Sequence, residues 1–364
     1  MNITETKKLP LAGLTIPEIA AVLHKIPGIS APPYQAGQIF SWIAKGAQSF
    51  GEMTNIPKAL AGRLEEYATV RSISPVQKYV DKDKTIKLVF ELPDGPHIES
   101  VLLPMAAEKS TKAEQYTACL STQAGCPMGC VFCKTGSMGF LRDLTAGEIT
   151  EQFLFLSDEL KNSPVKGRIS HIVVMGMGEP LLNLVALRKA LEVLCDPMGV
   201  NISKRKITVS TAGVYGGIID LANNGPGMEL AVSIASARDS LRSSLMPGAA
   251  KQPLYRLKEA LLLFQQKQKR QITFETVLLG GVNTGPEDAA ALIGFAKNLD
   301  VVINIIPWNP VKGLCFKGEP LKPCTPKDIK YFSDMLKKSG LNITQRYRRG
   351  CGISGACGQL GGDS

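Results

Sequence analysis

Three cysteines lie close together in the stretch Gly125-Cys-Pro-Met-Gly-Cys-Val-Phe-Cys-Lys134. Cys126, Cys130 and Cys133 have the spacing C-x3-C-x2-C, and no fourth cysteine completes the set. Iron–sulfur clusters are held by cysteine thiolates, usually four of them, so three ligands leave one iron of a cubane cluster open to a small molecule. Structural zinc is the alternative, but it takes four ligands, commonly in two spaced pairs. The triplet therefore predicts a [4Fe–4S] cluster with one open iron.

Two further cysteines could supply reactive thiols. Cys119 lies on or beside a predicted strand, shortly before the triplet, and Cys357 lies in Gly355-Ala-Cys-Gly-Gln-Leu360 near the C-terminus. Glycines give the segment around Cys357 little intrinsic order, so its thiol could swing into an active site, react and leave. Taken alone, the segment is interpreted more simply as a disordered tail with an incidental cysteine.

Composition limits the class of protein. A chain of 364 residues suits one large domain with an accessory piece. No run of 18 apolar residues predicts a transmembrane helix, and the N-terminus lacks the apolar region of a signal peptide. Nine cysteines, three of them in a tight triplet, indicate a reducing compartment. We expect a cytoplasmic protein that does not contact membranes.

The charge balance favours a polyanionic partner. Lysine and arginine exceed aspartate and glutamate by 42 to 32, and a net positive charge attracts nucleic acid. Basic residues cluster at 204–206, 267–270 and 346–349, the last beside Tyr347. Each cluster alone could be a solvated surface, but the three together with a tyrosine that can stack on a base favour RNA.

Apolar spacing divides the chain into four regions. Residues 1–72 predict a helical accessory domain with helices at 16–26, 34–45 and 57–67. Residues 73–112 predict a β-hairpin extension, with strands at 85–90 and 97–103, and a polar loop that covers 105–115. Residues 113–345 predict the main domain, and residues 346–364 a flexible tail.

The main domain alternates short apolar strands with amphipathic helices. The predicted strands are 117–121, 170–175, 206–210, 229–234, 272–279 and 301–306. Six β-α repeats imply a parallel sheet, and ligands of α/β barrels bind at the carboxyl ends of the strands. The fold class is therefore α/β, a partial (β/α)6 barrel open on one side, with the cysteine triplet at its ligand-binding edge.

The cysteine triplet is the core signature of the radical SAM superfamily, in which S-adenosylmethionine binds the open iron. Further motifs make the chain similar to the RlmN family of radical SAM RNA methyltransferases, whose near relatives are the Cfr enzymes. The resemblance covers almost the whole chain. It rests on Tyr34-Gln-Ala-Gly-Gln-Ile-Phe-Ser-Trp42, Met53-Thr-Asn-Ile-Pro57, Cys119-Leu-Ser-Thr-Gln-Ala-Gly-Cys126, Met175-Gly-Met-Gly-Glu-Pro-Leu-Leu-Asn183, Ile306-Pro-Trp-Asn-Pro310 and Ala356-Cys-Gly-Gln-Leu360.

This resemblance implies a mechanism. One S-adenosylmethionine methylates Cys357, and a second is cleaved at the cluster to a radical that takes a hydrogen from the new methyl group. The carbon radical adds to C2 of adenosine, Glu99 removes the C2 proton, and Cys119 attacks the sulfur of Cys357 to release the product. Without the resemblance, Glu99 could equally be an exposed strand carboxylate. The implied substrates are 23S ribosomal RNA and tRNA, with flavodoxin or ferredoxin as electron donor and a monomeric enzyme.

The resemblance also implies a cofactor pocket at the ends of the strands. Gly176 and Gly178 would allow close approach of the backbone, and the carboxylate of Glu179 would hold the ammonium group of the cofactor. Taken alone, these are weak signals, because polar residues at strand ends are often simple hydrogen-bonding groups. The residues implied to bind the cofactor are Gly178, Glu179, Ser210, Ser233, Ile234, Ala235 and Asn309.

Two positions depart from the family pattern. The family has Ser-Leu-His where this chain has Ser233-Ile-Ala235, and Arg-Gly-Asp-Asp where it has Arg349-Gly-Cys-Gly352. Loss of the histidine could alter cofactor affinity, and Cys351 could compete in disulfide exchange or stay idle. Two alternatives remain open: a Cfr-like adenine-C8 methyltransferase and a non-catalytic, metal-containing RNA-binding protein.

Overall fold

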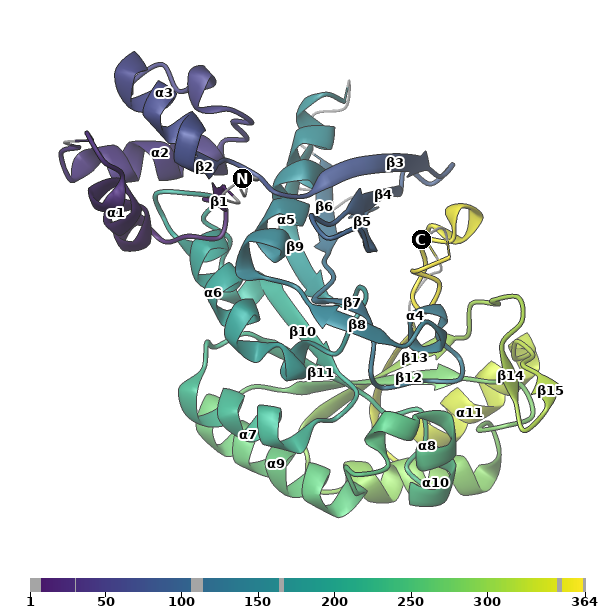
Figure 1. Cartoon of the computed structure of the whole chain (residues 1–364). Helices are drawn as coiled ribbons and strands as arrows, with labels where there is room; N and C mark the ends of the chain where they lie inside the picture. Colours follow the sequence, from purple (N-terminus) through teal and green to yellow (C-terminus); the bar gives the residue numbers. More distant parts are fainter. Residues whose placement is uncertain (1–7, 30, 106–113, 164–166, 346–348, 363–364) are drawn as a thin grey trace, which may run out of the picture.

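The computed structural model describes residues 8–29, 31–105, 114–163, 167–345 and 349–362. Its centre is a curved sheet of ten strands in the order β16-β13-β12-β11-β10-β9-β6-β5-β4-β3 (Figure 1). In the described part of the chain, the edge strands β16 and β3 do not pair, so the barrel is open. The parallel strands are β6 (Glu114–Cys119), β9 (Gly167–Val174), β10 (Ile207–Thr211), β11 (Glu229–Ser233), β12 (Ile272–Leu278), β13 (Val301–Pro307) and β16 (Asn342–Gln345).

The predicted partial α/β barrel is confirmed, and each of the six predicted strands is present. Helices connect the strands along the outside of the sheet (Figure 1). A capping box at Thr145 begins α5, and a second at Thr325 begins α11. The helices of the barrel are α5 (Ala146–Lys161), α6 (Leu184–Cys195), α7 (Tyr215–Asn224), α8 (Asp239–Leu245), α9 (Leu254–Gln268), α10 (Pro286–Ala296) and α11 (Pro326–Lys338).

One parallel strand, β16, was not predicted. It is four residues long and three of its residues are polar, so its sequence has no apolar run. Backbone pairing with β13 creates the strand, for instance between Ile343 and Ile303. Tertiary pairing therefore outweighs the weak local preference of this segment.

The N-terminal helical module is present, and its three predicted helices are confirmed as α1 (Ile16–Lys25), α2 (Tyr34–Ala44) and α3 (Lys58–Tyr67). A short parallel pair, β1 (Leu9–Pro10) and β2 (Ala68–Thr69), closes the module. The chain that leaves it is held on α5, because the carboxylate of Glu151 accepts the backbone N–H groups of Ser72 and Ile73.

The β-hairpin extension is larger than the sequence predicts and joins the main sheet. It has three antiparallel strands, β3 (Ser74–Val80), β4 (Ile86–Glu91) and β5 (His97–Pro104). β5 pairs with β6, with Val101 opposite Cys119, and so satisfies an edge that the barrel would otherwise leave open. Residues 106–113 of the expected loop lie outside the described residues, but Glu114 and Gln115 belong to β6, so the loop prediction is wrong for these two.

None of the helices in the described ranges combines the length and the hydropathy that crossing a bilayer requires.

Candidate active site

The cysteine triplet lies in a loop that short elements fix beside the carboxyl ends of the strands. β7 (Gln123–Gly125) and β8 (Phe140–Asp143) pair on either side of the loop, and α4 (Lys134–Ser137) follows the third cysteine. The N–H of Cys126 donates to the carbonyl of Gly139 at 2.7 Å. At Gly125, φ is +75° and an added Cβ would lie 2.0 Å from that carbonyl oxygen, so only glycine fits. The start of the loop is therefore rigidly placed.

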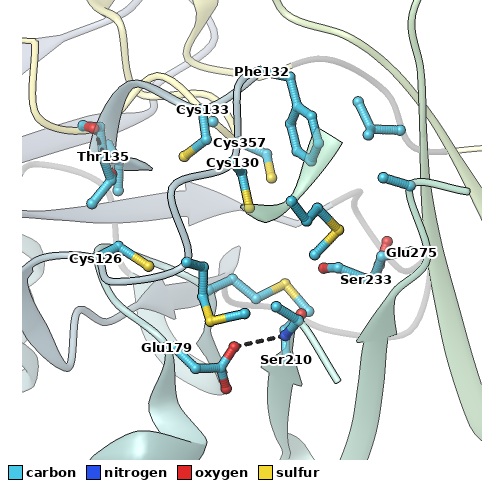
Figure 2. A pocket seen from close by; sticks show the side chains of 18 of the residues that line it. Cys126, Cys130, Phe132, Cys133, Thr135, Glu179, Ser210, Ser233, Glu275 and Cys357 are labelled. Carbon is cyan, nitrogen blue, oxygen red and sulfur yellow. Dashed lines mark hydrogen bonds between the residues drawn. The ribbon is translucent and has the colours of Figure 1, made fainter. Parts of the chain in front are cut away.

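The three thiols open into one pocket, together with the residues expected to bind the cofactor (Figure 2). The empty space of the pocket is about 1100 Å³ when its open mouth is included. Every predicted metal and cofactor residue except Ile234 lines it, and these are Cys126, Cys130, Cys133, Gly178, Glu179, Ser210, Ser233, Ala235 and Asn309. The side chain of Ile234 is instead buried in the core.

The donor set suits a multi-iron cluster better than a single ion. Among the described residues, no three His, Cys, Asp or Glu side chains converge where one metal ion could bind. Zinc requires its ligands around one centre, whereas cysteines that hold a cluster bind separate irons and lie further apart. Burial raises the pKa of Cys126 to about 12 and raises the pKa of Cys130 and of Cys133. Metal binding must therefore displace thiol protons.

The Gly-Met-Gly-Glu segment after β9 forms one wall of the pocket. Glu179 is buried, and its carboxylate accepts N–H bonds from Leu181 at 3.0 Å and Ala212 at 2.7 Å. Burial raises the pKa of Glu179, against the effect of these bonds. At Gly178, φ is +106° and an added Cβ would lie 2.7 Å from the Cβ of Gln123. The glycine is thus needed where the backbone closely approaches Gln123.

Strand ends supply the adjoining wall. Ser210 is the penultimate residue of β10, and Ser233, the last residue of β11, pairs with Glu275 of β12 (Figure 2). Glu275 is a second carboxylate of the pocket that the sequence analysis missed, and it accepts a hydrogen bond from Asn304 at 2.6 Å. Strand periodicity could have identified it, because Glu275 and Val277 both line the pocket, whereas Phe274 contacts Phe295 of α10.

A second pocket lies behind Cys357. It is lined by Cys119 and Thr117 of β6 and by Leu103 of β5. Cys357 lines this pocket and also the pocket of the triplet, and it is the only thiol in the described ranges that lines both. The structure therefore places Cys357 in the wall between the predicted cluster ligands and Cys119.

The tail that carries Cys357 is packed in this structure. Its Leu360 is buried, and the carbonyl of Leu360 accepts a hydrogen bond from Thr135 at 2.7 Å. The side-chain Nδ2 of Asn309 donates to the carbonyl of Cys357 at 3.0 Å. The thiol of Cys351 lies 3.7 Å from Oδ1 of the same side chain. Asn309 thus contacts the tail as well as the pocket.

Glu99 occupies a buried position on β5. Its side chain is 0% exposed, so the alternative of an exposed strand carboxylate is wrong. Lys87 of β4 lies 3.5 Å away and is equally buried. Glu99 is two residues from Val101, the partner of Cys119, and therefore faces the same side of the sheet as Cys119. It lines neither pocket.

Two of the basic clusters, 204–206 and 267–270, lie apart from the two cysteine pockets, whereas Arg349 of the third cluster lines the pocket of Cys119. Lys204, Arg205 and Lys206 are exposed, as is Lys267. Residues 346–348, including Tyr347, lie outside the described residues. The structure holds all nine cysteines as thiols.

Comparison with protein families identifies the class of protein first. The model of the "Radical SAM superfamily" matches residues 120–293, which contain the triplet and the barrel strands β9 to β12. Fold and pocket thus define a radical SAM enzyme, and this superfamily implies a [4Fe–4S] cluster and S-adenosylmethionine. A second model, "Ribosomal RNA large subunit methyltransferase N-terminal domain", matches residues 10–70, the helical module.

Relatives that match over most of the chain identify the family. The "Probable dual-specificity RNA methyltransferase RlmN" of Treponema denticola is 48% identical, over 90% of each chain. The "Dual-specificity RNA methyltransferase RlmN" of Solidesulfovibrio magneticus is 39% identical, over 96% of this chain and 95% of the relative. A crystal structure of a radical SAM methyltransferase from Sphaerobacter thermophilus superposes with a TM-score of 0.88 at 36% identity, covering 97% of this chain and 99% of the other. The chain belongs to the RlmN family of dual-specificity RNA methyltransferases.

Proposed function

We propose that this enzyme methylates C2 of adenosine in 23S ribosomal RNA and in tRNA, with Cys357 as the carrier of the carbon. The observation that supports this most is the position of Cys357, which lines both the triplet pocket and the pocket of Cys119. A group that receives a carbon at one site and delivers it at another must reach both. The names of the relatives, which act on RNA with dual specificity, supply the substrate class.

Cys126, Cys130 and Cys133 would hold the cluster in this proposal. When bound, the cluster and S-adenosylmethionine supply the radical chemistry that a carbon as unreactive as C2 requires. Glu179, Ser210, Ser233 and Asn309 would orient the cofactor from the wall opposite the thiols. Two cofactor molecules would be used in each turnover, one to methylate Cys357 and one for the radical step.

The chain's own groups would complete the transfer. Once the carbon bridges C2 and the sulfur of Cys357, the adduct still has one unpaired electron, which the cluster would accept, and Glu99 would take the C2 proton. The thiolate of Cys119 would then attack the sulfur of Cys357, so that the S–S bond forms as the bond from sulfur to the transferred carbon breaks. That electron pair stays with the carbon, which gains a proton to become the methyl group. A thiol reductant would then regenerate both cysteines.

The cellular setting follows from the same chemistry. A reducing cytoplasm keeps the thiols available, and flavodoxin or ferredoxin would deliver the electron for the radical step. The enzyme would act as a monomer.

Nucleoside analysis tests the proposal. We expect anaerobically loaded enzyme, given S-adenosylmethionine and reductant, to produce 2-methyladenosine in 23S ribosomal RNA and in tRNA. Each RNA is digested and measured by mass spectrometry, with enzyme that lacks reductant as the control. A methyl group at C8 would instead support the Cfr-like alternative, and an unmodified RNA would support the non-catalytic RNA-binding protein.

A further inference from the structure

The turn between β3 and β4 contacts the tail near Cys357, although 267 residues separate the contacting segments. The N–H of Gly350 donates to Asp83 at 3.0 Å, and the N–H of Gly352 donates to Asp81 at 3.0 Å. Figure 1 shows the C-terminal segment close to the free end of the hairpin. Two carboxylates of the accessory hairpin thus bind two backbone donors of the tail, one on each side of Cys351.

The tail is shaped for this contact. Gly350 has a φ of +66°, and an added Cβ would lie 2.9 Å from the methyl group of Thr85. An added Cβ at Gly352 would lie 2.9 Å from the carboxylate of Asp81. A side chain at either position would have to displace the Thr85 methyl group or the Asp81 carboxylate, because both distances are shorter than a normal contact, and at Gly350 the positive φ also favours glycine.

The charge of the hairpin strengthens the contact. Burial acts to raise the pKa of Asp83, but hydrogen bonds from Thr85 and Gly350 and the nearby charge of Arg349 outweigh it and lower the pKa. Asp83 is therefore ionised at neutral pH, and hydrogen bonds to an ionised acceptor are roughly twice as strong as neutral ones.

The other end of the tail is attached directly after the cysteine triplet. The N–H of Lys134 donates to the carbonyl of Gly358 at 2.8 Å, and the hydroxyl of Thr135 donates to the carbonyl of Leu360. Cys357 lies between these two attachments, one on the hairpin and one next to Cys133. Its position is thus set from both sides.

We infer that Asp81 and Asp83 are positioning residues, which bind the tail so that Cys357 stays in the wall between the two pockets. The functional part of this inference rests on the proposed role of Cys357 as carrier. A thiol that is already held in place reacts more efficiently, because less conformational entropy is lost when it reaches the reacting geometry. Without the hairpin attachment, the tail keeps its contacts with Asn309, Pro310 and the loop of the cysteine triplet.

The test compares Asp81→Ala/Asp83→Ala with wild-type holoenzyme. The first readout is hydrogen exchange of the peptide that contains Gly350 and Gly352, measured by mass spectrometry. We expect exchange to be about tenfold faster in the double variant, as when ~1.4 kcal/mol of attachment is lost. The second readout is the initial rate at which Cys357 gains a methyl group from S-adenosylmethionine, which we expect to fall about tenfold.

Matched variants separate positioning from general damage. Asp81→Asn/Asp83→Asn keeps an oxygen acceptor at each position and should restore most of both readouts. Glu91→Ala removes an exposed carboxylate at the end of β4 and should match wild type. Gly352→Asp disrupts the same contact from the side of the tail. Combined with Asp81→Ala/Asp83→Ala, it should change exchange and methylation little further, because both changes remove the same interaction.

The outcomes distinguish this inference from the proposed function. Wild-type exchange and wild-type methylation in Asp81→Ala/Asp83→Ala would overturn the positioning role. Fast exchange in that variant, with no methyl group ever found on wild-type Cys357, would uphold the attachment of the tail and refute the carrier function.

Discussion

The Cys357→Ala variant is expected to lose RNA methylation by at least ~10³-fold, the scale seen when a chemically required group is removed. Cys357 is the only thiol of the described chain that lines both pockets, so no other described thiol is placed to receive a carbon in one and present it in the other. The cluster ligands are untouched, and iron content should stay at the wild-type level. Methylated nucleosides and iron are measured on the same preparation.

Cys315→Ala is the matched control for this prediction. Cys315 lies in β14 (Cys315–Phe316), which pairs with β15 (Glu319–Pro320), and it is exposed and lines neither pocket. Methylation should survive its removal. Wild-type methylation by Cys357→Ala would show that the carbon reaches RNA without the tail thiol. A parallel Cys351→Ala variant reports whether the extra thiol participates at all.

The Cys119→Ala variant is expected to accumulate a covalent complex between enzyme and RNA. Cys119 and Cys357 line the same pocket, and the carbon–sulfur bond to Cys357 breaks only when a second thiolate attacks that sulfur. Without Cys119 the bond forms but is not resolved. Labelled RNA should migrate with the protein on a denaturing gel, and nuclease digestion should leave a nucleotide mass on the peptide of Cys357.

Cys195→Ala serves as the comparison here, because Cys195 ends α6 away from both pockets. It should turn over normally and leave no complex. A Cys119→Ala variant that releases methylated RNA at the wild-type rate would remove Cys119 from the mechanism.

Much of the barrel could be predicted because its buried strands have apolar residues at alternate positions. β12, for example, has the run Ile-Thr-Phe-Glu-Thr-Val-Leu, and its predicted and observed ends differ by one residue. β16 could not be found in this way, because its strand character comes from pairing with β13 rather than from its own residues. The pairing of β5 with β6 could not be predicted either, because it depends on how the residues of the two strands align with each other.

For the site too, local features could be predicted from the sequence, whereas contacts between distant segments could not. The triplet could be recognised from spacing alone, since neighbouring cysteines in one loop act together. The contact of Asp81 with Gly352 could not, because no sequence pattern links two polar segments so far apart. That contact also gives a physical reason for the departure from the family pattern at Gly352, where an aspartate would place a second carboxylate against Asp81.

The account depends on a cluster held by Cys126, Cys130 and Cys133 that cleaves S-adenosylmethionine. The most direct test is the amount of 5′-deoxyadenosine formed by anaerobically loaded enzyme after addition of S-adenosylmethionine and reductant. The account predicts product from wild type and none from Cys130→Ala. A colourless, zinc-loaded wild type that forms no 5′-deoxyadenosine would contradict it.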